Sequence, residues 1–367
     1  MHNPIYFLAL KKQFSLIKGE IMQAIENTLE KGEYSGGKNI EEFEKRFSEL
    51  TNTKFNIAVN SGTSALHLAM IAGNIGKGDE VIVPANTFIA TAWAPAYTGA
   101  KPVFVDCNPL DWEIDSTKIE EQISAKTKAI IGVHLYGQPC EIDSIKQIAH
   151  RNKLLFIEDA AQAQGAEYKG KKVGGFGTLG CFSFYPTKNL GTYGEAGAIS
   201  TNNEEIYQRV KKLRNNASIK KYEHDEIGFN MRMGCMEAAV LLVKMKYLEA
   251  WNNKRREIAL KYQKYIDNPL IHFQKQYVER ASVYHLFVIT TEKREAMISH
   301  LNRHNIFPGM HYPIPCHLQK AFKELGYKKG DFPNAEYLAD HCLSIPMYPE
   351  LTEEETDRII EVLNKYK

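Results

Sequence analysis

Short apolar runs alternate with helical segments through the first half of the chain. Near-continuous apolar runs, typical of strands buried on both faces, cover residues 81–83, 102–105, 129–133, 154–157, 181–184 and 196–200. Between many of them, helices are predicted over residues 64–71, 116–124 and 142–151. This alternation predicts an α/β domain whose central sheet is mostly parallel.

The pattern changes after residue 200. Helices are predicted over residues 204–213 and 236–262, and the second is long enough to connect two domains. The rest of the chain predicts a smaller α+β domain, with a strand over 284–289, a helix over 295–304 and a charged helix over 353–365. We therefore expect a large α/β domain over residues 1–250, with its N-terminal segment packing partly on a small domain over residues 251–367.

Composition narrows the class of protein. A length of 367 residues is enough for about two domains, and a formal net charge of +2 gives no reason to expect nucleic-acid binding. The six cysteines form no CxxC pair and do not cluster, which favours reduced thiols over disulfides or a metal site. With no signal-peptide pattern at the N-terminus and no membrane-length apolar stretch, we expect a cytoplasmic protein without membrane contact or bound metal.

A lysine and an acid follow two of the predicted strands. The run over residues 154–157 is followed by Glu158 and then Asp159, and Lys188 follows the run over 179–184. Polar residues at the carboxyl ends of parallel strands tend to face a shared site. A pyridoxal phosphate enzyme needs such a pair, because the lysine holds the cofactor as a Schiff base and the acid keeps the pyridine nitrogen protonated. A solvated lysine and a capping acid are the alternative interpretation.

Neighbouring residues favour the cofactor site. A small polar loop over residues 60–66 opens a helix, and Gly62 lets the backbone approach a ligand closely. The N–H groups and hydroxyls of Thr63 and Ser64 suit a phosphate at the helix N-terminus, although such residues also cap helices in general. The remaining candidates are Phe88 for stacking on a flat ring, Gln162 for the ring hydroxyl and Ser183 for a further phosphate contact.

The chain resembles the DegT/StrS family of pyridoxal-phosphate-dependent nucleotide-sugar aminotransferases. That family has the aspartate aminotransferase fold, fold type I of the pyridoxal-phosphate-dependent transferases. The resemblance runs in order through nearly the whole chain, over residues 32–37, 61–66, 78–84, 87–91, 158–162, 183–190, 228–233 and 311–317. In appearance it is nearest to the dTDP-3-amino-3,6-dideoxyhexose transaminases.

The resemblance implies a role for each matching residue. Lys188 would bind the cofactor and then shuttle a proton, and Asp159 would pair with the pyridine nitrogen. Family positions assign Gln162 to the ring hydroxyl, Phe88 to the ring face, and Gly62, Thr63 and Ser183 to the phosphate. Asn230 matches a position that reaches the phosphate from the partner subunit, which implies a homodimer with two shared active sites. L-Glutamate is the amino donor that the family implies.

The same resemblance suggests the substrate. Residues 133–138 and Tyr185 look like enzymes that aminate carbon 3 of a dTDP-3-keto-6-deoxyhexose. The product would be a dTDP-3-amino-3,6-dideoxyhexose for a lipopolysaccharide, S-layer or related glycan. Thr187 instead resembles enzymes acting at carbon 4, so amination of a dTDP- or UDP-4-keto-6-deoxy sugar is the alternative. Candidate substrate contacts are Tyr34, Tyr185, His285, His311, Tyr312 and His317.

Other activities on the same scaffold are alternatives. Family members that dehydrate sugars replace the lysine with histidine, so Lys188 favours transamination. A non-enzymatic regulator that binds pyridoxal phosphate is a further alternative, and the intact set of Asp159, Gln162 and Lys188 argues against it.

Overall fold

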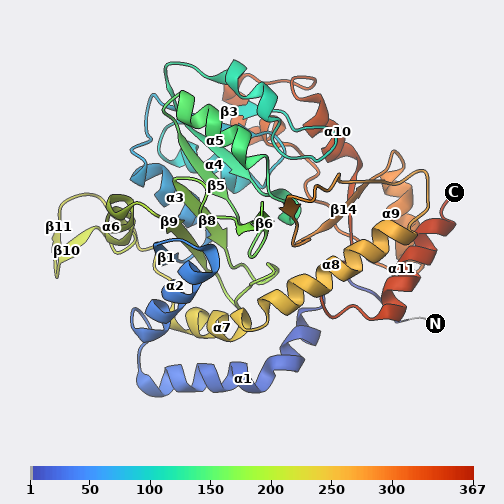
Figure 1. Ribbon diagram of the computed structural model, residues 1–367, viewed down its shortest axis with the longest axis horizontal. Coiled ribbons are helices and arrows are strands. Elements are labelled where there is room, and N and C mark those ends of the chain that lie inside the picture. Colours follow the sequence, from blue (N-terminus) through green and yellow to red (C-terminus); the bar gives the residue numbers. More distant parts are fainter. Residues whose placement is uncertain (1–2) are drawn as a thin grey trace.

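The computed structural model describes residues 3–367 (Figure 1), and its larger part is built on one seven-stranded sheet. The strand order is β1-β9-β8-β5-β4-β2-β3. Neighbours from β8 through β5, β4 and β2 to β3 run parallel, while β9 is antiparallel to both β8 and β1. The strands are β1 (Phe55–Val59), β2 (Glu80–Pro84), β3 (Lys101–Val105), β4 (Thr127–Val133), β5 (Leu155–Asp159), β8 (Leu179–Ser183) and β9 (Gly197–Thr201). The prediction of a mostly parallel central sheet is confirmed.

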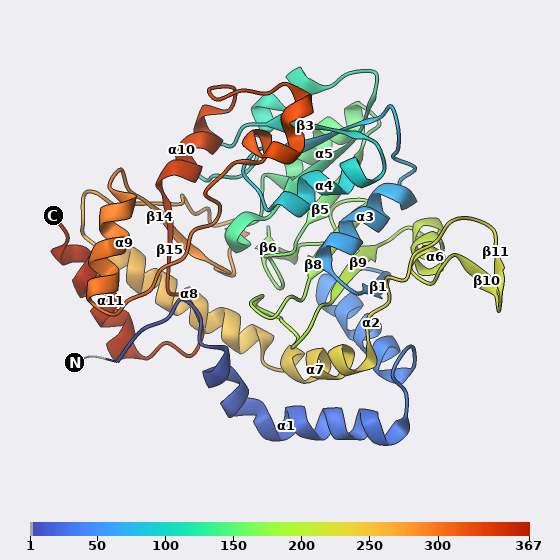
Figure 2. The same ribbon diagram turned by 180° about the vertical axis from the view of Figure 1, so that it is seen from behind.

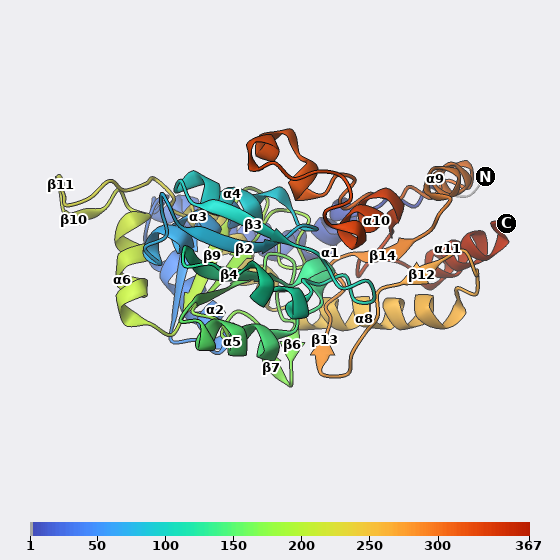
Figure 3. The same cartoon turned by 90° about the horizontal axis from the view of Figure 1, so that it is seen from above.

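Helices cover both faces of this sheet (Figure 3), which explains why its strands are apolar throughout. Alternate residues of one strand enter different cores: Val81 and Val83 pack with one group of helices and Ile82 with the other. The first group is α3 (Gly62–Ala72), α4 (Ile89–Tyr97) and α6 (Glu204–Leu213). The second is α2 (Lys38–Thr51), α5 (Ile142–Arg151) and α7 (Cys235–Met245).

A smaller sheet and its helices enclose a third hydrophobic core. The antiparallel strands β12 (His272–Phe273), β14 (Phe287–Thr290) and β15 (Cys342–Ile345) pack against α8 (Leu248–Tyr265), α9 (Arg294–Arg303) and α11 (Glu353–Lys365). Ile5 joins this core, and its backbone N–H donates to the carbonyl of Asn305 at 2.8 Å. The predicted division at residue 250 falls inside α8 and stays a prediction.

The remaining elements lie around these three cores. Helix α1 (Leu10–Lys31) runs beside α7 (Figure 2), and the two share the core of Ile17, Ile21, Val240 and Val243. The hairpin β10–β11 projects beyond α6 at one end of the molecule (Figure 1). The other bounds are β6 (Glu167–Tyr168), β7 (Lys171–Lys172), β10 (Ser218–Lys220), β11 (Glu223–His224), β13 (Arg280–Ala281) and α10 (Pro333–His341). Within residues 3–367, no helix is long and apolar enough to cross a membrane.

Two helix predictions were wrong in detail. Residues 116–124 form two short 3₁₀ turns, η1 (Ser116–Lys118) and η2 (Glu120–Gln122), and the chain then becomes extended at Ile123. The Asp115 carboxylate stabilises a tight turn at the start of this segment, because it accepts hydrogen bonds from both the N–H and the hydroxyl of Thr117. The long helix predicted over 236–262 is two helices, α7 and α8, since the N–H of Tyr247 bonds three residues back to Lys244 and the helix axis turns there.

The strand predicted over residues 284–289 begins later, at Phe287. Tyr284 has a φ of 44°, a left-handed conformation that a strand cannot include. The N–H of Leu286 donates to the carbonyl of Tyr136 at the edge of the large sheet. Residues 284–286 therefore leave the small sheet and place His285 beside the cavity described next.

Candidate active site

A cavity of about 470 Å³ lies at the carboxyl ends of the parallel strands. Val133, Asp159 and Ser183, the last residues of β4, β5 and β8, all line it. Most of the predicted site residues also line it: Gly62, Thr63, Phe88, Gln162, Tyr185, Lys188, His285, His311 and Tyr312. Residues that are far apart in the sequence therefore meet because parallel strands end at the same edge of the sheet.

Lys188 is held in a short turn after β8. Its backbone N–H donates to the carbonyl of Tyr185 at 2.9 Å, and its side chain lines the cavity. Burial lowers the pKa of Lys188 to about 8, and the Asp159 carboxylate opposes that shift only in part. A larger share of the amine is therefore neutral near pH 8 than in a solvated lysine, which makes it a better nucleophile.

Asp159 is buried at the end of β5, with 5% of its surface exposed. One carboxylate oxygen accepts a hydrogen bond from the hydroxyl of Thr91 at 2.7 Å, and the other accepts from the N–H of Ala161 at 3.2 Å. Burial raises the pKa of Asp159, while these two hydrogen bonds and Lys188 act in the opposite direction. A protonated ring nitrogen beside this carboxylate would offset the cost of burial, so the site fits a pyridinium group.

The N-terminus of α3 forms the opposite wall. The Ser61 hydroxyl caps the helix by accepting from the N–H of Ser64 at 3.0 Å, and the first turn contains no acid. A Cβ at Gly62 would lie 2.6 Å from the Cβ of Ser183, so only glycine lets the loop approach β8 this closely. Backbone donors, hydroxyls and the positive end of the helix dipole together suit a phosphate. The residues present therefore fit pyridoxal phosphate at both its ring nitrogen and its phosphate.

Gln162 is oriented by a backbone donor. The N–H of Tyr136 must bond to its carbonyl oxygen, at 2.7 Å, so its amide NH₂ points to the hydroxyl of Tyr312 at 3.0 Å. The ring of Phe88 lies 5.7 Å from that of Tyr312 and is 49% exposed, so one face is available for stacking. Both rings line the cavity together with Gln162.

Two of the three predicted histidines line the cavity. The Nδ1 of His311 lies 2.8 Å from the hydroxyl of Ser344, and burial, with a smaller effect from Lys188, lowers its pKa to about 4. Burial lowers the pKa of His285 well below its usual value. His317 lies elsewhere: its Nε2 is 3.0 Å from the carboxylate of Glu336, and its ring packs on Phe332.

Asn230 and Tyr34 also lie outside this cavity within the described chain. Tyr34 is 57% exposed, and the exposed Asn230 is bridged to Asn215 beside the end of β1. Both side chains therefore face solvent in one copy of the chain.

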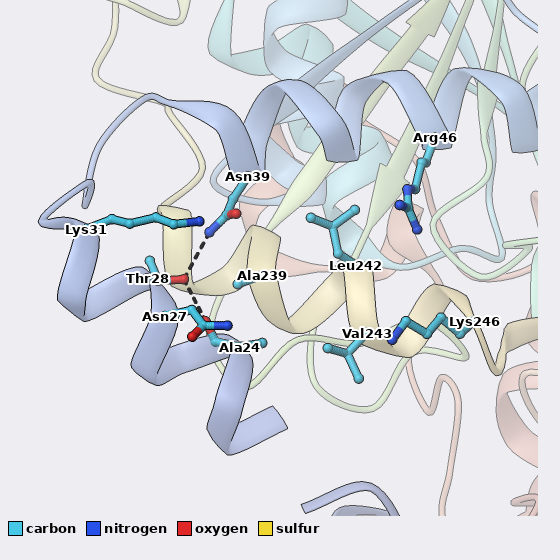
Figure 4. Close-up of a pocket in the computed structure, with 10 residues that line it drawn as sticks. All are labelled: Ala24, Asn27, Thr28, Lys31, Asn39, Arg46, Ala239, Leu242, Val243 and Lys246. Carbon is cyan, nitrogen blue, oxygen red and sulfur yellow. Dashed lines mark hydrogen bonds between the residues drawn. The ribbon is translucent and has the colours of Figure 1, made fainter. Parts of the chain in front are cut away.

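A second hollow of about 230 Å³ lies between α1, α2 and α7 (Figure 4). Lys31, Arg46 and Lys246 line it together with apolar side chains and three polar uncharged ones, Asn27, Thr28 and Asn39, and its described lining residues include no carboxylate. Outside the hollow, Arg46 pairs with Glu42 at 2.5 Å and Lys246 with Glu20 at 2.8 Å. This hollow lacks the acid–base pair of the larger cavity.

Comparison with known proteins agrees with this geometry. The model of the DegT/DnrJ/EryC1/StrS aminotransferase family matches residues 15–364. The chain belongs to this family. It is 44% identical over 362 residues to the dTDP-3-amino-3,6-dideoxy-alpha-D-galactopyranose transaminase of Aneurinibacillus thermoaerophilus, covering 99% of both chains. It is also 40% identical over 362 residues to a pleiotropic regulatory protein of Geobacillus stearothermophilus, covering 98% of this chain and 97% of that one.

Solved structures of similar chains extend the match. The crystal structure of Streptomyces venezuelae DesV in complex with a ketimine intermediate has a TM-score of 0.97 at 38% identity, covering 99% of this chain and 98% of that one. NtdA from Bacillus subtilis with bound cofactor PMP has a TM-score of 0.92 at 34% identity, covering 99% and 85%. The chain is therefore an aminotransferase of fold type I, and pyridoxal phosphate is its cofactor.

Sequence reasoning missed several residues of this site, and two of them contact its chemical groups directly. Thr91 stands one turn into α4, and only the packing of α4 on the sheet places its hydroxyl against Asp159. Asn189 follows Lys188 directly and contacts His285. The position of each within a family-like segment was the only signal in the sequence.

Proposed function

We propose that this aminotransferase moves an amino group from L-glutamate to the C-3 keto group of a dTDP-3-keto-6-deoxyhexose. The product would be a dTDP-3-amino-3,6-dideoxyhexose, made in the cytoplasm for glycan synthesis. The buried pair of Lys188 and Asp159 at one cavity carries the reaction class. The sugar rests on the full-length relative named for a dTDP-3-amino-3,6-dideoxyhexose.

In this proposal the cavity residues divide the work of binding and proton transfer among them. Bound pyridoxal phosphate supplies an electron sink for the charge left when a proton leaves the carbon that bears the amine. Lys188, with its pKa lowered to about 8, holds the cofactor and moves that proton as a general base and acid. Asp159 keeps the ring nitrogen protonated, and Gly62, Thr63 and Ser183 hold the phosphate. Phe88 stacks on the ring, while Gln162 orients its hydroxyl side.

Residues that line the cavity also bear on the choice of carbon 3 over carbon 4. Tyr185 and Thr187 both line it, and Tyr185 is 46% exposed. Gln138 is fully buried, and its amide donates to the carbonyl of Lys275 at 3.1 Å. Gln138 thus lies outside the lining and would act on the sugar only by supporting the wall, so Tyr185 carries the assignment.

A homodimer with shared sites completes the proposal. Asn230 is exposed and outside its own cavity, which suits a residue that binds the phosphate held by a second copy. Mixing Lys188→Ala with Asn230→Ala subunits tests this arrangement. If Asn230 acts across the interface, mixed dimers contain one site with both native residues and recover activity that neither parent has. Activity in Asn230→Ala alone equal to the wild type would count against the shared site.

A single-turnover spectrum tests the substrate. The enzyme is converted to its amino form with L-glutamate, freed of excess donor, and mixed with dTDP-3-keto-6-deoxyhexose or dTDP-4-keto-6-deoxyglucose. Rapid return of the starting absorbance with only the 3-keto sugar is the expected result. Return with only the 4-keto sugar would assign carbon 4, which Thr187 favours. If the absorbance returns with neither dTDP sugar but does return with a UDP-linked keto sugar, the substrate carries UDP in place of dTDP.

A regulatory role is the second candidate, because one full-length relative is named a pleiotropic regulatory protein. A regulator needs cofactor binding but no amino transfer. Failure of L-glutamate and of other amino acids to change the cofactor's absorbance would favour this role over catalysis.

A further inference from the structure

His285 lies at the end of a buried row of amide side chains that are linked by hydrogen bonds. Its Nδ1 lies 3.2 Å from the side-chain oxygen of Asn189, the residue next to Lys188. The Asn189 amide nitrogen donates to the carbonyl of Val283 at 3.0 Å and to the side-chain oxygen of Asn252 at 2.9 Å. The Asn252 amide nitrogen donates in turn to the carbonyl of Gln164 at 2.9 Å. Asn189, Asn252 and His285 are each at most 5% exposed.

Two backbone carbonyls fix which group donates in each of these hydrogen bonds. A carbonyl only accepts, so the group that faces Gln164 must be the NH₂ of Asn252, and the group that faces Val283 must be the NH₂ of Asn189. The oxygen of Asn189 is then left facing His285. Because that oxygen also only accepts, the proton between them must belong to Nδ1 of His285.

The remaining nitrogen of His285 is therefore an acceptor. The ring lines the cavity, and its Nδ1 edge is covered by Asn189, so Nε2 is the nitrogen turned toward the cavity. Burial, followed by the nearby charges of Lys188 and Arg255, lowers the pKa of His285 well below its usual value, which keeps the ring neutral. A neutral ring with Nδ1 protonated carries a lone pair on Nε2.

We propose that Asn189 is a positioning residue that locks His285 in the Nδ1–H form, and that His285 Nε2 accepts a hydrogen bond from a hydroxyl of the keto sugar. L-Glutamate does not suit this acceptor, since its carboxylates are also acceptors and its amine is the reacting group. Sugar hydroxyls are donors. A sugar without that hydroxyl leaves a buried acceptor unpaired and is rejected. The substrate half of this inference rests on the proposed function.

Nitrogen NMR of the holoenzyme tests the protonation directly. With ¹⁵N in the histidine rings, the pair of resonances lost in His285→Gln is that of His285. We expect a protonated, pyrrole-type Nδ1 and an unprotonated, pyridine-type Nε2 before any substrate is added. The opposite assignment would overturn the inference while leaving the proposed amino transfer intact. If the holoenzyme transfers no amino group to any dTDP sugar, yet Nδ1 of His285 is protonated and Nε2 is not, only the proposed function is overturned.

Substitution of Asn189 tests the positioning role. Asn189→Leu should mix the two protonation forms of His285, whereas Asn189→Asp should keep Nδ1 protonated, because a carboxylate also accepts from it. Asn268→Leu is the matched control: it removes a buried amide that donates to Leu363 and Tyr366, far from the cavity, and should leave His285 unchanged. A fully protonated Nδ1 in Asn189→Leu would overturn the positioning role.

Two probes test the substrate half. dTDP-6-deoxyglucose, which has hydroxyls and no reactive ketone, should shift the Nε2 resonance, and L-glutamate alone should not. In separate half-reactions, Asn189→Leu should lower kcat/KM for the keto sugar about ten- to hundredfold, as expected for a lost buried hydrogen bond. The half-reaction with L-glutamate should change much less. Equal losses in both half-reactions, or an Nε2 resonance that moves only with L-glutamate, would overturn this assignment.

Discussion

The hydroxyl of Thr91 lies 2.7 Å from Oδ2 of Asp159, and both side chains are buried. The Thr91 hydroxyl is also 2.9 Å from that of Thr87, which lies just before α4, so two threonines form a polar contact behind the carboxylate. This contact opposes the rise in the pKa of Asp159 that burial causes. It therefore helps to keep the carboxylate charged for the ring nitrogen of the cofactor.

Thr91→Val should shift the acidic limb of kcat/KM to higher pH. Removing the hydroxyl raises the pKa of Asp159 further, and the reaction needs the ionised form. At neutral pH we expect kcat/KM to fall about tenfold, corresponding to ~1.4 kcal/mol. Thr98→Val, which removes a hydroxyl bonded to Pro95 at the other end of α4, should leave the profile in place. An unchanged acidic limb in Thr91→Val would contradict the role of this contact.

Lys188→Met should abolish transamination and stabilise the cofactor-free protein in a pH-dependent way. The pKa of Lys188 is about 8 in the folded chain against an ordinary value of 10.5. Below pH 8 both states are protonated, and burying the ammonium costs up to about 3 kcal/mol. That cost disappears as the pH rises from about 8 to 10.5, so the advantage of the methionine variant should shrink over this interval.

Urea unfolding of the cofactor-free wild type and Lys188→Met at pH 7 and pH 10 measures this difference. Lys31→Met, at an exposed position on α1, serves as the control and should give no such gain. If Lys188→Met raised the free energy of unfolding equally at both pH values, the gain would come from side-chain packing and not from removal of the charge.

Gly62→Ala should weaken cofactor binding. The new Cβ would lie 2.6 Å from the Cβ of Ser183, so the loop must move away from β8. We expect the Kd for pyridoxal phosphate to rise at least about tenfold, since the phosphate donors at the start of α3 move with the loop. Gly19→Ala, where a Cβ meets open space in α1, should raise stability by up to about 1 kcal/mol and leave binding unchanged. Unaltered cofactor affinity in Gly62→Ala would argue against a phosphate at this loop.

Glu158→Gln should destabilise the fold. The carboxylate is fully buried and accepts from the backbone N–H groups of Gly174, Phe176 and Gly177 at 2.7–2.8 Å, and His134 lies 3.1 Å away. A glutamine must turn an NH₂ toward at least one of these donors, so the free energy of unfolding should fall by about 3 kcal/mol. The melting temperature measures the loss, and the exposed Glu121→Gln should not change it. Equal melting temperatures for the two variants would mean that the site tolerates an amide.

The sequence by itself determined six of the seven strands of the central sheet, all but β1, and the two chemical groups at the sheet's edge. Its apolar runs marked the strands because those strands are buried on both faces, and this is a local property of composition. Asp159 and Lys188 could be placed together because each follows a parallel strand, and parallel strands end at one edge. The glycine and hydroxyl residues of the loop after β1 were found for a different reason, because a small polar loop that opens a helix suits a phosphate.

Only the tertiary structure decided the contacts that tune these groups. Thr91 reaches Asp159 through the packing of α4, and the direction of the Asn189–His285 bond is set by carbonyls of distant segments. His317 looked like a cavity residue, yet it pairs with Glu336 and packs on Phe332 outside the cavity lining. Hydrogen bonds are directional and join residues far apart in the chain, so the order of residues does not specify them. The fold class follows from local sequence patterns, whereas the protonation of each side chain in the site depends on its tertiary contacts.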